Sequence, residues 1–126
     1  MKNFEQTLID IRPKVIFNEI HSNPIQQFQD NTLRPILKLQ HGKIIVLYNN
    51  YLETHKINLK HFTAIEINNK IEKSVQQNLA LNSLLKGLII ALFTSDEIFY
   101  WLSNKVEINK RIQQLIIKRI QNSFVE

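Results

Sequence analysis

The chain has 126 residues, no cysteine, a formal net charge of +5, and 44% of its residues are hydrophobic. This length suffices for one domain with its own core, and this composition excludes a disordered chain, disulfides, thiolate metal sites and a cysteine nucleophile. No segment has the pattern of a secretory signal or is apolar over enough residues to cross a membrane, so we expect a cytoplasmic protein without membrane contact. The basic charge alone favours an acidic partner only weakly.

The first part of the chain predicts two short helices and a connector. We expect a helix over Asn3–Ile11 and an extended connector over Lys14–Ile20, where β-branched residues follow a proline. Asn23 and Pro24 have the pattern of an N-cap followed by proline at the first helical position. The second short helix should therefore begin there and run to about Asn31.

A long helix is predicted over Leu33–His55, with Thr32 as its N-cap. At 100° per residue, one side of this helix collects six apolar residues, namely Ile36, Leu37, Ile44, Leu47, Tyr48 and Tyr51. Leu39 and Val46 fall on the opposite side. A helix that is apolar on two sides is either central in the fold or covered by another subunit.

The second half of the chain predicts further helices. After a loop around Lys56–Lys60, one helix carries an inward stripe formed by Ala64, Ile67, Ile71 and Val75. Leu79–Phe93 is apolar on nearly every side but too short to cross a bilayer, which is typical of a helix buried at the centre of a domain. Thr94 and Glu97 have capping-box spacing, so a short helix over Thr94–Asn104 should follow.

A last helix is predicted over Glu107–Ser123, with its apolar residues turned inward, namely Ile108, Ile112, Leu115, Ile116 and Ile120. Together these elements predict an all-α fold. We expect residues 1–126 to form a compact single-domain bundle of about five to seven helices, with Leu79–Phe93 as its central buried helix.

The residues that usually carry chemistry form no catalytic or metal-binding pattern. His41 and His55 share one face of the long helix, but about 21 Å along the axis separates them, so they cannot share a metal. Asp96 and Glu97 are neighbours on a helix and point in different directions. We therefore name no catalytic residue and no metal ligand, and we expect no cofactor.

Small residues form a stripe on the helix over Leu79–Phe93, at Ser83, Gly87 and Ala91. Such a stripe lets another helix approach closely. We favour tight packing within the chain. The alternative is a dimer seam, to which Leu39 and Val46 would contribute from the long helix.

Basic residues gather on one side of the last helix, at Lys110, Arg111 and Lys118. With the preceding short helix and a polar turn, this segment has some features of a DNA-reading helix-turn-helix pair. Phe99 stands where a small residue is needed, the turn lacks glycine, and the spacing is about one residue short. A solvated basic face is the ordinary alternative.

Two polar residues, Gln40 and Arg119, fall where apolar ones are expected. Buried amide and guanidinium groups need partners. They either satisfy backbone groups or line a polar pocket, and we favour the structural role for both.

Three segments carry a family resemblance: 28–40 (FQDNTLRPILKLQ), 86–94 (KGLIIALFT) and 109–112 (NKRI). On them the chain resembles a family of short uncharacterised bacterial proteins with an all-α fold. Some members carry the label glyoxalase, but metal-dependent glyoxalases use βαβββ modules with paired His and Glu ligands, which this sequence lacks. The resemblance implies no catalytic residue and draws attention to Asn31, Arg34, Gln40 and Arg111. The candidate polar cluster that we name is Asn31, Arg34, Gln40 and Arg119.

These observations predict a binding or interaction module that acts as a homodimer in the cytoplasm and contacts a protein partner. A nucleic-acid-binding protein that uses the last two helices is the alternative. An enzyme comes third, since only the glyoxalase label suggests one.

Overall fold

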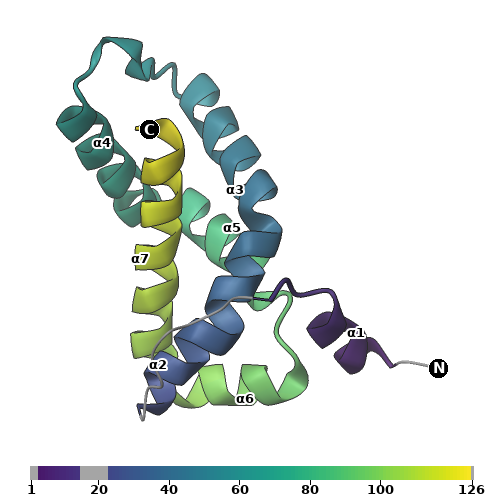
Figure 1. Cartoon of the computed structure of the whole chain (residues 1–126). Coiled ribbons are helices and arrows are strands. Elements are labelled where there is room, and N and C mark those ends of the chain that lie inside the picture. Colours follow the sequence, from purple (N-terminus) through teal and green to yellow (C-terminus); the bar gives the residue numbers. More distant parts are fainter. Residues whose placement is uncertain (1–2, 15–22, 126) are drawn as a thin grey trace.

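Helices make up most of the computed structural model, which describes residues 3–14 and 23–125 (Figure 1). The α-helices are α1 (Phe4–Asp10), α2 (Pro24–Phe28), α3 (Arg34–Thr54), α4 (Ala64–Gln77), α5 (Leu79–Ile90), α6 (Ser95–Ser103) and α7 (Lys105–Phe124). A π-helical turn, η1 (Gln29–Leu33), joins α2 to α3, and a 3-10 turn, η2 (Leu59–His61), precedes α4. No strand occurs in the described residues, which confirms the all-α prediction. The connector predicted at Lys14–Ile20 lies, from residue 15 on, outside them.

Helix α7 is the element that most other helices contact, since it packs against α3, α4, α5, α6 and η1. Its four isoleucines at i, i+4, i+8 and i+12 are fully buried, as the helical period predicts: Ile108, Ile112, Ile116 and Ile120. Each buried side chain of this size contributes about 1.5 to 3 kcal/mol to the free energy of folding. The inward stripe of the last helix is therefore the main ridge of the core.

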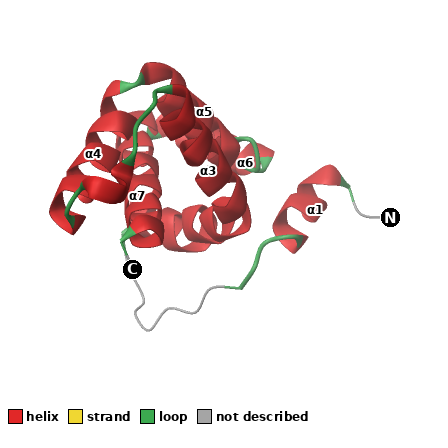
Figure 2. Cartoon of the chain, turned by 90° about the horizontal axis from the view of Figure 1, so that it is seen from above, coloured by secondary structure: helices red, strands yellow, loops and turns green. Residues whose placement is uncertain are grey.

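Helix α5 does not hold the central position that its composition predicts. Leu81, Leu85 and Ile89 are buried against the core, whereas Leu79 and Leu84 on its other side are 78% and 50% exposed. Figure 2 shows α5 along the outside of the bundle. An apolar helix of twelve residues can cover the core from one side, and its composition alone does not distinguish this position from the centre.

The long helix begins differently from the prediction. The predicted cap of α2 is confirmed, because the Asn23 side chain accepts a hydrogen bond from the backbone of Ile25 at 2.9 Å. However, α2, η1 and α3 follow one another without a break, and Thr32 caps nothing. The π-helical turn ends two residues before Pro35, which has no amide hydrogen for the helical ladder. Within this turn, the Thr32 hydroxyl donates to a carboxylate oxygen of Glu97 at 3.0 Å.

A buried ion pair fastens the N-terminal segment to the start of α6. Both terminal nitrogens of Arg12 donate to the Glu97 carboxylate, at 2.7 and 2.8 Å, and one also donates to the carbonyl of Leu92 at 2.9 Å. Glu97 also completes the predicted capping box with Thr94, which is confirmed. Burial acts to raise the pKa of Glu97, but hydrogen bonds from Arg12, Thr94 and Thr32 outweigh it and hold this pKa below its ordinary value.

Candidate functional site

Helix α3 separates two surfaces that could serve a function. On the side that faces α5, Gln40 is buried and its Nε2 donates to the backbone carbonyl of Leu88 at 3.0 Å. Backbone amides at the end of α5 bond to the carbonyls of Gly87, Ile89 and Ile90, so Gln40 supplies a partner for the carbonyl between them. Gln40 thus has the structural role that we favoured.

The first surface, which we call the α3–α5 face, consists of exposed residues on both helices: Leu39, Val46, Ser83, Leu84, Gly87 and Ala91. The small-residue stripe does not pack within the described chain, since a methyl group added to Gly87 would meet no atom within 4 Å. Leu39 adjoins Gln40, and Ala91 lies about one turn after Leu88. The bond between Gln40 and Leu88 therefore brings α3 and α5 together close to one end of each exposed strip.

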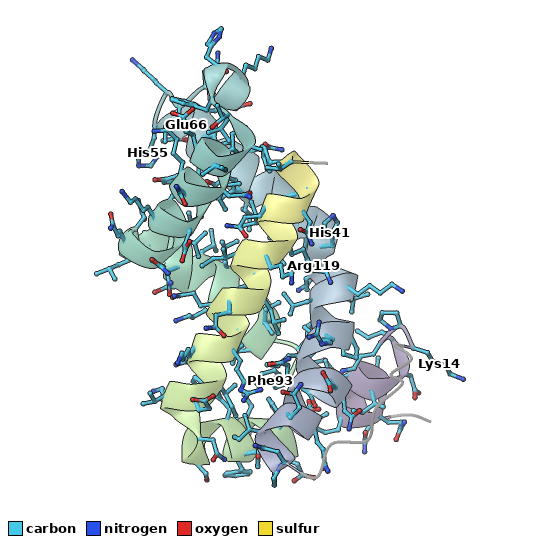
Figure 3. The ribbon with its side chains drawn as sticks, turned by 60° about the vertical axis from the view of Figure 1, so that its left-hand side comes forward. Lys14, His41, His55, Glu66, Phe93 and Arg119 are labelled. Carbon is cyan, nitrogen blue, oxygen red and sulfur yellow. The ribbon has the colours of Figure 1, made fainter. Side chains whose placement is uncertain are left out.

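The second surface, which we call the cationic cleft, is a hollow of about 500 Å³ between α3 and α7. Its lining comes from one side of each helix, with Arg34, Leu37 and His41 on α3 and Leu115, Lys118, Arg119, Asn122 and Ser123 on α7. Figure 3 shows the side chains of His41 and Arg119 together in the space between the two helices. None of the residues that line the cleft is acidic.

Arg119 has no carboxylate partner among the described residues. Its Nη1 lies 3.4 Å from Nδ1 of His41, a long contact that requires a neutral imidazole with Nδ1 as the acceptor. Burial and the positive charge of Arg34 lower the pKa of Arg119. Arg34 uses its Nε for Asp30, at 3.0 Å, and neither of its terminal nitrogens has a hydrogen bond in the described part of the chain.

The structure brings together two members of the predicted polar cluster and separates the others. Arg34 and Arg119 line the cationic cleft, whereas Asn31 is exposed on η1 and Gln40 faces α5. The sequence analysis missed His41 as a neighbour of Arg119. The available signal was the placement of Arg34, Leu37 and His41 on one side of α3.

The predicted basic face of α7 divides in two. Arg111 is held within the chain, since it donates to Glu107, Gln26 and Gln29 at 3.0 to 3.1 Å. Lys110 and Lys118 are exposed and line a groove of about 570 Å³ between α4 and α7, which we call the amide-lined groove and which also contains one carboxylate, Glu72. Its amide side chains are those of Asn68, Gln76, Gln113, Gln114, Gln121 and Asn122. This outer side of α7 is therefore open to a partner, as is the side that lines the cationic cleft.

The described helices and titratable side chains also limit what the site can be. Over residues 3–14 and 23–125, no three His, Asp or Glu side chains are grouped so that they could hold a metal ion. None of the helices in these ranges combines the length and the apolar character that crossing a membrane requires.

The chain matches no model of a known protein family, no curated protein and no solved structure. These comparisons add no support to the family resemblance of segments 28–40, 86–94 and 109–112. The α3–α5 face, the cationic cleft and the amide-lined groove are therefore the observations that bear on function.

Proposed function

We propose that this protein is a cytoplasmic binding module that acts as a homodimer through the α3–α5 face. The observation that carries the proposal is the open side of α5. There Leu84 is half exposed, and Gly87 has free space where a side chain would stand. A large apolar side chain next to uncovered small residues gives a surface that a second helix can approach closely.

The composition of this face supports a second copy of the chain as its occupant. None of its six residues is charged, and the exposed Lys43, which lies between Leu39 and Val46 on the same side of α3, stays at the edge of the contact if α5 supplies most of the interface. In a two-fold symmetric dimer, the same patch serves both partners, and the protruding Leu84 of one copy can pack over the open Gly87 of the other. An exposed apolar helix face also has the character of the uncharged core of an interface.

Sedimentation velocity at micromolar concentration tests the proposal, with the variant Gly87→Lys. We expect a dimer for the natural chain and a monomer for the variant, because lysine adds both bulk and a charge that faces its own copy across the two-fold axis. Lysine is also a better helix former than glycine, and its Cβ meets open space, so the fold should persist.

Asn69→Lys provides the matched control, because it adds the same charge at an exposed position of α4, away from the α3–α5 face. This variant should stay dimeric. A natural chain that is monomeric at micromolar concentration, or equal dissociation of both variants, contradicts the proposal.

A nucleic-acid-binding module is the second candidate, and the amide-lined groove favours it. Lys110 and Lys118 can contact phosphates there, and amide side chains can bond to base edges. Binding of an oligonucleotide should weaken with salt, and Lys110→Gln should reduce both the affinity and the salt dependence. This candidate is contradicted if the affinity does not change with salt concentration, or if it does not change when these lysines are replaced.

A further inference from the structure

We propose that the cationic cleft binds a small molecule that carries a phosphate group. This inference concerns a different surface from the α3–α5 face and does not depend on the homodimer. It rests on the cations that converge on the cleft, on the absence of a carboxylate from its lining, and on its concave shape.

The cleft gathers more positive charge than the described part of the fold neutralises, because the ion pair with Asp30 balances one of its cations, Arg34. Arg34 comes from α3, and Lys118 and Arg119 come from α7, so two helices bring three permanent cations to one hollow. His41 adds an imidazole from α3. The Arg34 carboxylate partner, Asp30, does not line the cleft, and no described carboxylate pairs with Arg119. An anion that enters the cleft would meet cations on both sides.

The two guanidinium groups have donors to spare. The hydrogen bond that Arg119 makes in the described chain is its long contact with His41, and neither terminal nitrogen of Arg34 bonds to a described residue. A guanidinium presents parallel N–H groups that match two oxygens of one phosphate, and such charge-assisted bonds are about twice as strong as neutral ones. His41, which lies beside Arg119, adds an imidazole ring to the polar groups of the cleft.

The charge and shape of the cleft select the class of ligand. Three permanent cations suit a group with more than one negative charge, and a phosphate monoester carries about −1.5 to −2 at pH 7. A hollow of about 500 Å³ lies within the usual range for small-molecule sites. Leu37 and Leu115 give it an apolar part, and Asn122 and Ser123 provide polar groups for the rest of such a ligand.

A small ligand fits this arrangement better than a nucleic acid. The cations of the cleft converge on one hollow between two helices, whereas a nucleic acid needs cations spread along a surface, to follow successive phosphates. Lys118 lines both the cleft and the amide-lined groove, but the exposed Lys110, which would extend such a row along α7, lines the groove and not the cleft.

Calorimetric titration of the full chain with inorganic pyrophosphate tests the proposal. We expect saturable binding, and Arg119→Gln and Lys118→Gln should each weaken it about tenfold or more, because each removes a charge-assisted contact. Lys118 is exposed, so its variant folds even if Arg119→Gln does not. Lys60→Gln, on η2 and outside the cleft, removes the same charge and should leave the affinity within about twofold.

The same titrations contain the outcomes that overturn the proposal. The proposal is wrong if the natural chain does not bind pyrophosphate. It is also wrong if Lys60→Gln weakens binding as much as the two cleft variants do, because net charge alone would then explain the attraction. An oligonucleotide that binds more tightly than pyrophosphate, and loses affinity with Arg119→Gln, would assign the cleft to nucleic acid instead. Gly87→Lys should bind pyrophosphate with the affinity of the natural chain. Pyrophosphate binding can therefore be interpreted even if the protein is not a homodimer.

Discussion

Two arginine sites in this molecule differ in how their charge is balanced. Arg12 is largely buried, and its guanidinium bonds to both oxygens of Glu97 and to a backbone carbonyl. Arg119 is half-buried, faces His41 and another arginine, and has no carboxylate partner in the described chain. A fold that encloses an arginine for stability supplies it with acceptors. The contrast therefore marks Arg12 as structural and Arg119 as available to a ligand.

The largest expected effect is at the Arg12 site, where Glu97 balances the charge of the arginine. Glu97→Gln should lower the free energy of unfolding by about 3 kcal/mol, because it leaves the buried Arg12 charge without its partner. Urea unfolding measures this loss. Glu107→Gln is the matched control, since its carboxylate pairs with Arg111 but is 49% exposed, and such pairs contribute about 0 to 1 kcal/mol. Similar losses for the two variants would show that the Arg12 site is not the anchor that its geometry indicates.

A smaller effect should appear as a dependence on pH. The folded-state pKa of Glu97 lies below its ordinary value of 4.5, so near and below that pH the unfolded chain binds more protons than the folded one. The contribution of Glu97 is thus present above pH 4.5 and is lost as the pH falls through the lower, folded-state pKa. Urea unfolding across this range should show a steeper loss for the natural chain than for Glu97→Gln. Parallel curves would contradict this assignment.

The same contrast explains which features could be predicted from the sequence. The caps at Asn23 and Thr94 join residues two or three positions apart, and the buried isoleucines of α7 follow from the helical period, so local rules suffice for both. Arg12 and Glu97 are far apart in the chain, as are His41 and Arg119. Such pairs depend on how helices are arranged in space, and no periodicity within one helix encodes that arrangement.

The position of Arg119 was nevertheless marked in the sequence, because a cation interrupts an apolar sector there. What the sequence could not supply was its surroundings. A buried carboxylate from another helix would have made it a structural residue like Arg12, and only the structure shows Arg34 and His41 there instead. The exposed side of α5 could not be predicted from the sequence for a related reason, since an apolar helix is compatible with both the centre and the edge of a bundle.

The smallest expected effect is at Arg119, which has no carboxylate partner in the described chain, and it is a gain and not a loss in the free energy of unfolding. In phosphate-free buffer of low ionic strength, Arg119→Gln should leave the free energy of unfolding unchanged or raise it by a few tenths of a kcal/mol, because it removes repulsion from Arg34. Sodium chloride should narrow the difference from the natural chain, since salt screens this repulsion. Urea unfolding at two salt concentrations measures both. A loss near that of Glu97→Gln would mean that the fold itself satisfies Arg119, and the distinction between the two arginine sites would no longer hold.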